Sequence, residues 1–248
     1  MKYIILDTET TGLNGKIIEL AFMVIEPRNS FSTYQMYHTY CYPGDDTPIE
    51  YEAMATHHIV PEMIEDEPAI ENTMEFKLLN ELNTPENIMV IHNAEFDLAM
   101  LEKAGFKSKM QLIDTLIVSR HLFPASAMHK MQYFRYSLGL HYLEKAFCES
   151  HGIPDIKAHR ADGDVVVLQL LFERLREGKT DKELIQLTNK IPLVYRMPFG
   201  KHRNMLVQDL VKNDKKYVRW MLDKLPDLSK DLRYTLNYYL NGEVISLF

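Results

Sequence analysis

Two carboxylates, Asp7 and Glu9, stand two residues apart at the end of the apolar run 3–6. Side chains two apart in a strand point the same way, so the two charges share one side where the predicted strand ends. Like charges held together are costly unless a cation balances them. The pair therefore predicts a cation site at the carboxyl end of the first strand, the edge where open α/β sheets usually bind ligands.

Two further carboxylates interrupt the apolar faces of predicted helices. Asp97 falls inside a stripe at helical spacing that is otherwise formed by Ala94, Leu98, Leu101 and Ala104. Asp164 does the same in the helix predicted over 159–178, whose apolar face contains Ala161, Val165, Leu168, Phe172 and Leu175.

The four carboxylates together favour a metal site. A single inward Asp is more often a cap or the partner of a buried Arg. Four inward carboxylates from three separate elements are hard to explain without cations, since an unpaired buried carboxylate is very costly. Oxygen-only ligands favour Mg²⁺ or Mn²⁺ over zinc.

His159 lies five residues before Asp164, at the start of the same predicted helix. A histidine there is often only a polar surface residue. Next to a metal site, however, its near-neutral ordinary pKa would allow it to take a proton from a reacting water.

The elements that must position these residues indicate an α/β fold with a mixed sheet flanked by helices. Three strands in succession are followed by alternating helices and strands. We expect strands over 2–7, 16–26, 33–43 and 87–93, a helix near 69–82, a helix that Asn93 caps and that ends before Gly105, a strand passing into a helix over 109–124, and the helix over 159–178.

Length, composition and charge limit the class of protein. The chain has 248 residues, 46% of them hydrophobic and 25% charged, which is enough for a substantial folded core. Its two cysteines, in no ligand spacing, argue against a disulfide framework or a cysteine zinc site and suit the cytoplasm. We expect no membrane span, and the apolar run that stops at Asp7 is too short for a signal peptide.

The charge also divides the chain. The net charge is −7, yet residues 195–248 hold 10 Lys and Arg against 6 Asp and Glu, a balance of +4 that leaves −11 for the rest. We therefore predict a catalytic domain over 1–178, a linker over 179–194 and a small, mostly helical C-terminal module over 195–248. The module's cations stand beside aromatic residues, a pattern typical of single-stranded nucleic-acid binding. Its candidate contacts are Lys201, Arg203, Lys215 and Lys216.

The motifs together resemble those of the DEDDh 3′–5′ exonucleases, a family with a ribonuclease-H-like fold. The resemblance rests on D-T-E at residues 7–9, on H-N-A-E-F-D ending at Asp97, and on His159 followed at the family's spacing by Asp164. It covers residues 1–175, and the order of the motifs and their elements agree as well. The C-terminal region is in turn similar to the module of a DNA-directed member, so the resemblance spans nearly the whole chain.

The resemblance implies a two-metal hydrolysis with two Mg²⁺ or Mn²⁺ ions. Asp7 would bridge both ions, Glu9 and Asp164 would complete the first site, and Asp97 would act partly through water. His159 would be the general base on the attacking water. The products would be a 5′-mononucleotide and a DNA strand shortened at its 3′ end.

The resemblance also implies contacts with the terminal nucleotide. These candidates are Thr10, Thr11, Gly12, Leu13, Met54, His57, Asn93 and Phe96. Core packing is an equal alternative for Phe96. The family often has glycine where this chain has His58, and the C-terminal motif more often has glycine at Asn204.

Three alternatives remain at the level of the sequence. An RNA substrate, as for the oligoribonuclease-like and RNase T-like members, is the main one within the family. A non-catalytic nucleic-acid-binding protein on the same fold would require a lost ligand or base, and none of the five residues is missing. Phosphatases of the haloacid dehalogenase type use D-x-D, and Glu9 makes that a poor match. DNA repair is the process that we expect.

Overall fold

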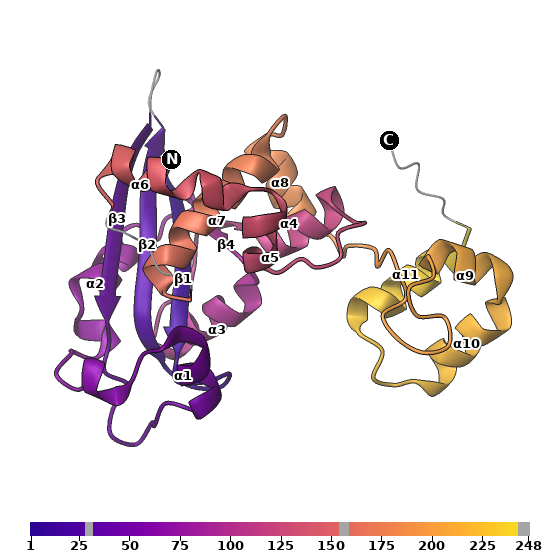
Figure 1. Ribbon diagram of the computed structural model, residues 1–248, viewed down its shortest axis with the longest axis horizontal. Coiled ribbons are helices and arrows are strands. Elements are labelled where there is room, and N and C mark those ends of the chain that lie inside the picture. Colours follow the sequence, from indigo (N-terminus) through magenta and orange to yellow (C-terminus); the bar gives the residue numbers. More distant parts are fainter. Residues whose placement is uncertain (28–31, 154–158, 243–248) are drawn as a thin grey trace.

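The computed structural model describes residues 1–27, 32–153 and 159–242. Five strands form one mixed sheet in the order β3-β2-β1-β4-β5, with helices on both sides of it (Figure 1). The α/β, ribonuclease-H-like fold predicted from the sequence is confirmed. The strands are β1 Tyr3–Thr10, β2 Ile17–Pro27, β3 Ser32–Tyr40, β4 Ile88–Ile91 and β5 Gln111–Asp114.

The directions of the strands bring three of their carboxyl ends to one edge. β1 runs antiparallel to β2 but parallel to β4, and β4 runs parallel to β5. The carboxyl ends of parallel strands meet at the same edge of a sheet. The end of β1, the residues that follow β4 and the last residue of β5 therefore lie along one edge.

The two helices predicted to carry Asp97 and Asp164 are present close to their predicted bounds. Asp97 lies in α3, Ala94–Lys103, and Asp164 in α7, Ala161–Arg176. The other helices are α1 Tyr51–His57, α2 Met74–Glu81, α4 Thr115–Leu122, α5 Met131–Ser137, α6 Glu144–His151 and α8 Asp181–Thr188. Short 3₁₀ turns cover Pro61–Met63, Ile70–Asn72 and Leu140–Tyr142.

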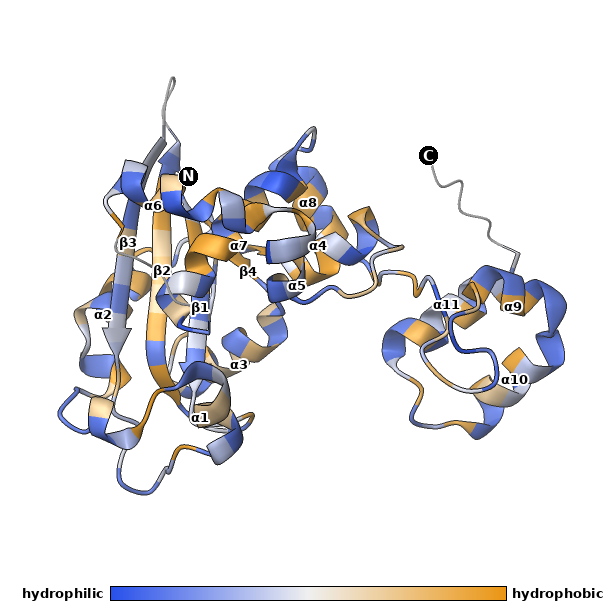
Figure 2. Cartoon of the chain, in the orientation of Figure 1, coloured by the Kyte–Doolittle hydropathy of each residue, from blue (hydrophilic) through white to orange (hydrophobic). Residues whose placement is uncertain are grey.

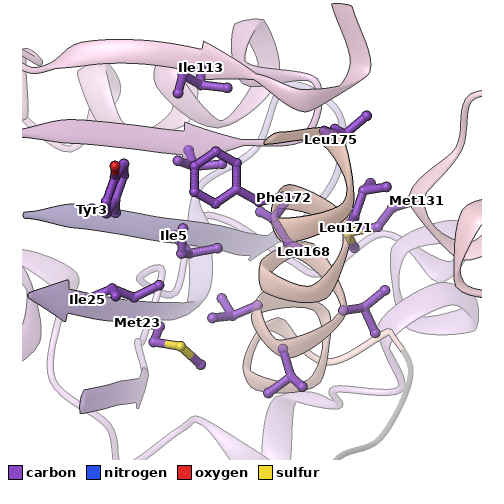
Figure 3. Close-up of a cluster of buried hydrophobic side chains, with 14 of the residues drawn as sticks. Tyr3, Ile5, Met23, Ile25, Ile113, Met131, Leu168, Leu171, Phe172 and Leu175 are labelled. Atoms are coloured by element: carbon purple, nitrogen blue, oxygen red, sulfur yellow. The ribbon is translucent and has the colours of Figure 1, made fainter. Parts of the chain in front are cut away.

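The two faces of the sheet carry two separate hydrophobic cores. Tyr3 and Ile5 of β1 pack on the α7 side, as Figure 3 shows, together with Leu168 and Phe172. The β1 residues that alternate with Tyr3 and Ile5 point to the other face of the sheet. They belong to the opposite core, which α2 and α3 cover. Since Phe172 is fully buried, replacing it with alanine would cost about 3–5 kcal/mol. The alternation of β1 therefore fixes which side each of its later residues faces.

The segment 179–194, which the sequence predicted to be a linker, contains α8. Thr180 caps this helix in a capping box with Glu183. Leu184 is fully buried and belongs to the core on the α7 side, and the Thr188 hydroxyl accepts a hydrogen bond of 3.0 Å from the Asp114 amide. α8 is thus packed on the sheet domain, and only the residues after it form a connection.

Three short helices follow, as predicted for the C-terminal module (Figure 1). They are α9 Val207–Asn213, α10 Lys215–Lys224 and α11 Lys230–Leu240. They enclose a core of their own, which includes Met197, Val207, Leu210, Val218, Met221, Leu232 and Leu236. An ion pair between Arg120 of α4 and Asp231 of α11 links the module to the sheet domain. Residues 243–248 of the predicted module lie outside the described residues.

Apolar colour in Figure 2 is concentrated on the central strands and on the inner sides of the helices. Among the described residues, none of the helices has both the length and the apolar character needed to cross a membrane.

Candidate active site

Asp7 and Glu9 continue the face of β1 that packs against α7. Tyr3 and Ile5 occupy this face in the core, so the alternation places the two carboxylates on the same side, further along the strand. The pairing of β1 with β2 shifts register between Glu9 and Thr10. Such irregularities occur next to active sites, where they redirect side chains. The apolar strand thus ends in two acidic groups held in fixed directions.

Asp164 reaches the same place from the first turn of α7. Its own helix brings apolar residues to the sheet, and Asp164 is buried among them, as the sequence predicted. Glu19 of β2 anchors the start of this helix. It is fully buried and accepts hydrogen bonds of 3.0 Å from the Ala161 amide and from Arg160 Nε. The charged group on β2 therefore fixes the entry of α7 beside β1.

Asp97 comes from the helix on the opposite face of the sheet. Its carboxylate accepts hydrogen bonds from the Thr8 amide at 3.1 Å and from the Thr8 hydroxyl at 2.7 Å. Thr8 stands between Asp7 and Glu9 in the strand. Asp97 is therefore tied directly to the strand that carries the first two carboxylates.

The charges of these groups are strongly disfavoured in the absence of a cation. Burial and then the nearby Asp97 and Asp164 carboxylates raise the pKa of Asp7 well above its usual range. Burial and the neighbouring acids likewise raise the pKa of Glu9 to about 8. Burial also raises the pKa of Asp97 and of Asp164 to about 7, although their hydrogen bonds oppose this effect.

The geometry fits a divalent cation. Oxygens of Asp7, Glu9 and Asp164 all lie within 4.8 Å of one another. They are hard oxygen donors, the ligands that Mg²⁺ and Mn²⁺ prefer, and a bound cation would offset the burial and mutual repulsion that raise their pKa values. Asp97 faces Asp7 closely enough to be the largest charged influence on it.

A second acidic group lies nearby but has a different character. Glu19, His38 and Asp162 also have possible ligand atoms within 4.8 Å of one another. The Glu19 oxygens, however, already bond Arg160, the Ala161 amide and, at 2.7 Å, His38 Nε2. The guanidinium of Arg160 supplies the positive charge there, so this group is a structural ion-pair network.

His159 lies at the entrance to α7 and is exposed. Its φ of 59° is in the left-handed region, and its backbone amide donates a hydrogen bond to the Asp164 carboxylate. The backbone is thus bound to the metal-ligand candidate while the imidazole faces solvent. This position suits a group that exchanges protons with a bound water.

Four of the predicted nucleotide contacts, residues 10–13, run from the last residue of β1 into the loop after it. Thr10 and Thr11 are buried, whereas Leu13 is 77% exposed and so is available to a ligand. The Glu50 amide donates to the Thr11 carbonyl at 2.8 Å, and the Glu50 carboxylate covers Gly12. The strand end and the α1 region therefore form one surface beside the carboxylates.

His57 and Met54 belong to α1 on that surface. The ring of His57 is almost fully buried; its Nε2 donates to the Thr10 carbonyl at 3.2 Å and its Nδ1 accepts from the Ile59 amide at 3.0 Å. Burial lowers the pKa of His57, in keeping with a neutral ring. His57 thus ties α1 to the strand end, and Met54 is half-buried against Ile59 and its neighbours.

Asn93 and Phe96 lie at the start of α3. Asn93 occupies the N-cap position, as predicted, but its side chain makes no capping bond. Instead the Asp114 carboxylate accepts from the amides of Asn93 and Ala94, at 3.2 and 2.9 Å. The capping side chain is therefore Asp114, and the exposed Asn93 side chain is left for other contacts. Phe96 is half-buried against the core beneath α3, in line with the packing alternative.

The sequence did not reveal the residues that orient Asp164. Gln132 of α5 donates a hydrogen bond of 2.7 Å from Nε2 to Asp164 Oδ1. Arg135 donates at 3.3 Å to Gln132 Oε1 and forms a two-point ion pair, with both distances 2.6 Å, to Glu144. Gln132 and Asp164 are 32 residues apart in the chain, and no local sequence pattern indicates that they are in contact.

The C-terminal candidates lie in the helical module. Lys201 and Arg203 are exposed in the loop before α9, and Lys215 and Lys216 are exposed at the start of α10. Figure 1 shows this module beside the sheet domain, away from the elements that carry the carboxylates.

Comparison with known proteins adds to this geometry. The model of the exonuclease family called RNase T matches residues 4–172. Exodeoxyribonuclease 10 of Escherichia coli K12 is 31% identical, over 96% of this chain and 98% of its own. The DNA polymerase III subunit epsilon of Rickettsia typhi is 30% identical, over 77% of this chain and 81% of its own.

Solved structures share the fold. An exonuclease X in complex with 5′ overhanging duplex DNA has a TM-score of 0.56 and 24% identity, covering 75% of this chain and 99% of that one. An E. coli exonuclease I–single-stranded DNA complex has a TM-score of 0.53 and 16% identity, covering 75% of this chain and 42% of that one.

Proposed function

Because the chain belongs to the RNase T exonuclease family, we propose that it is a 3′–5′ exodeoxyribonuclease that releases 5′-mononucleotides from DNA 3′ ends. The observation that carries the proposal is the convergence of the oxygens of Asp7, Glu9 and Asp164 within 4.8 Å of one another, with Asp97 bound beside them. No local structural role explains so many disfavoured charges in one place.

We propose two Mg²⁺ or Mn²⁺ ions as cofactors, held by Asp7, Glu9, Asp97 and Asp164. When bound, such ions stabilise the charge that develops on the attacking and leaving oxygens of a phosphodiester. The chain's own contribution is to fix the ligands. Thr8 orients Asp97, and Gln132 with the His159 amide orients Asp164.

His159 is the proposed general base. Its backbone bonds Asp164 and its side chain is exposed, so the imidazole would accept the proton of the attacking water and pass it to solvent. The terminal nucleotide would lie over the strand end, against the backbone of residues 10–12 and the exposed Leu13 side chain. Met54, His57, Asn93 and Phe96 border that surface.

DNA is the proposed substrate because the relatives that match most of this chain are named for DNA. RNA is the second candidate, since the carboxylate geometry does not distinguish the sugars. DNA repair in the cytoplasm is the proposed setting, with the catalytic unit in the sheet domain and the helical module as an accessory.

The deciding experiment uses matched 3′-labelled DNA and RNA strands with Mg²⁺, with Mn²⁺ and with a chelator. We expect mononucleotides from DNA with either cation and none with the chelator. Label released from RNA alone would replace the DNA proposal by the RNA-directed one.

A His159→Ala variant tests the mechanism in the same assay. Loss of a general base lowers turnover by about 10²–10⁴-fold. Binding of Mn²⁺, measured by electron paramagnetic resonance, should remain. A non-catalytic nucleic-acid-binding protein would show no turnover in the unaltered chain, and that result would reject the enzymatic proposal.

A further inference from the structure

The C-terminal module displays an aromatic pair of which one ring, Tyr217, packs against the module's core, while the other, Trp220, lies outside it. Tyr217 and Trp220 of α10 stack with ring centroids 5.5 Å apart and planes 23° apart. Their neighbours Val218 and Met221 are fully buried in the module's core, whereas Trp220 is 48% exposed. The structure thus separates Trp220 from the residues that hold the module together.

One cation lies over Tyr217, and two more are exposed on α10 close to Trp220 in the sequence. Lys201 Nζ lies 4.4 Å from the centre of the Tyr217 ring and pairs with Asp214 at 3.2 Å. Lys216 stands one helical turn before Trp220, and Arg219 is its direct neighbour; both are exposed. The exposed side of α10 therefore combines positive charge with a large aromatic surface.

The loop before α9 supports the aromatic pair from one side. A side chain at Gly200 would meet the Tyr217 hydroxyl at 3.0 Å, and the His202 ring packs edge-on against Tyr217 with centroids 5.0 Å apart. The backbone of the loop is closed by a 2.8 Å hydrogen bond from the Asn204 amide to the Met197 carbonyl. These contacts fix the position of the Tyr217 ring in the unbound protein.

We propose that this cationic–aromatic surface, defined as Lys201, Lys216, Tyr217, Arg219 and Trp220, binds unpaired nucleotides of a single-stranded nucleic acid. A base stacks on Trp220, and the phosphates lie beside the cations. Charge complementarity supports this partner, because residues 195–248 carry +4 while the rest of the chain carries −11. The inference rests on the proposed function for its substrate, which the surface holds at a distance from the cleaved end.

Trp220 is the single tryptophan of the chain, so its fluorescence reports on the surface directly. The experiment titrates the full chain with an oligodeoxythymidylate of about 15 nucleotides, long enough for a typical binding site. A chelator prevents hydrolysis. We expect the fluorescence to be quenched on binding, and the affinity to fall as salt rises.

Variants identify the contacts. Trp220→Ala should weaken binding about tenfold, measured by anisotropy of a labelled strand, and Trp220→Phe should retain most of it. Lys216→Ala should reduce the salt dependence, whereas Lys230→Ala, an exposed lysine at the start of α11, is the matched control and should change little. Circular dichroism checks that each variant is folded.

Two results would overturn the inference. One is binding of the oligonucleotide without any change in Trp220 fluorescence and with equal affinity in Trp220→Ala. The other is a fluorescence change with anionic phosphatidylglycerol vesicles but none with the oligonucleotide, which would identify a membrane-surface site instead.

The test is separable from that of the proposed function. With Mg²⁺ present, hydrolysis of a labelled trinucleotide should be the same in Trp220→Ala and in the unaltered chain. If the unaltered chain hydrolyses the trinucleotide but Trp220 does not respond to the long strand, the surface inference alone fails. Absence of hydrolysis in every variant would count against the proposed function.

Discussion

A single neutral side chain, Gln132, sets the direction of a proposed metal ligand. Its hydrogen bond of 2.7 Å to Asp164 Oδ1 acts together with the bond from the His159 amide to fix the direction of this carboxylate. We predict that Gln132→Met, which keeps the length but removes the donor, weakens Mn²⁺ binding by about tenfold. Titration followed by electron paramagnetic resonance measures this without any substrate.

Gln111→Met is the matched control, because the Gln111 side chain is exposed and donates to the Pro85 carbonyl, at 3.3 Å, rather than to an acidic residue. Equal Mn²⁺ affinity in the Gln132 variant and this control would show that Asp164 needs no such partner.

Leu13 is a residue whose exposure indicates a binding role. An apolar side chain that is 77% exposed contributes little to folding, yet it stands four residues after Glu9. We predict that Leu13→Ala lowers kcat/KM on DNA about tenfold, because the variant loses an apolar contact with the terminal base whose burial is worth about 1.5 kcal/mol. Its melting temperature should match that of the unaltered chain.

Met74→Ala serves as the control for Leu13, since Met74 is 74% exposed on α2. A similar small effect of both substitutions on kcat/KM would place the terminal base elsewhere.

The acidic residues of the site could be predicted, but their partners could not. Asp97 and Asp164 stand out because each breaks an apolar stripe within one helix, and that pattern is local. Gln132 meets Asp164 across 32 residues, and Glu19 meets the Ala161 amide across 142. Contacts of that kind depend on the assembled fold, and the sequence carries no periodic signal for them.

At the level of elements, the long helices α3 and α7 and the short helices α2 and α4 were predicted, whereas four other short helices of the sheet domain were not. α7 has 16 residues and α3 has 10, enough for several turns of a repeating apolar stripe. α1 and α5 have only 7 each, and α6 and α8 have 8. Such short helices are marginal alone and form because the sheet domain packs against them, which is why the sequence predicts only a linker where α8 forms.

The first departure from the family pattern, His58, lies at the end of α1. His58 is the C-cap residue, with φ 60° and ψ 21°, and its amide bonds the Met54 carbonyl. The left-handed region favours glycine, so a histidine there is strained. We predict that His58→Gly raises the free energy of unfolding by about 0.5–1 kcal/mol, measured by urea denaturation.

His58→Ala should bring no such gain, because alanine keeps the Cβ that causes the strain. A loss of stability in His58→Gly would show that the imidazole makes a contact worth more than the strain. Asn204, with φ 69°, is the second departure, and asparagine tolerates this region better than most residues.

The junction between β4 and α3 depends on a neutral histidine. Burial lowers the pKa of His92 to about 4, while its Nε2 donates to the His129 carbonyl at 2.9 Å. A histidine with a depressed pKa in the folded state takes up protons more readily when unfolded. Stability is therefore full above about pH 6.5 and falls as the pH drops toward 4.

We predict that His92→Gln loses less stability over this pH interval, by about 2 kcal/mol, than the unaltered chain. Urea denaturation followed by circular dichroism at each pH measures the slope. His141→Gln is the control, at a partly exposed histidine of another segment. Parallel pH profiles for all three proteins would assign the acid sensitivity to other groups.

On the scale of the whole molecule, charge and hydrophobic core divide the chain at the same place. The buried members of the two cores of the sheet domain extend up to Leu184, and those of the module's core begin with Met197. The acidic part binds cations in the proposed mechanism, and the basic part faces the polyanion. Each part therefore has a hydrophobic core of its own and a different proposed role.

A chain that ends at Leu193 tests this division. It keeps α8, and with it Leu184, while the module and the ion pair between Arg120 and Asp231 are removed. We predict weaker binding of single-stranded DNA and a shallower plot of log affinity against log salt, by about 0.7 for each phosphate that the module neutralises in the full chain. Turnover of a trinucleotide should persist, because the four carboxylates and His159 remain. Identical affinity and salt slope in the two chains would mean that the +4 charge of the module serves some purpose other than holding DNA.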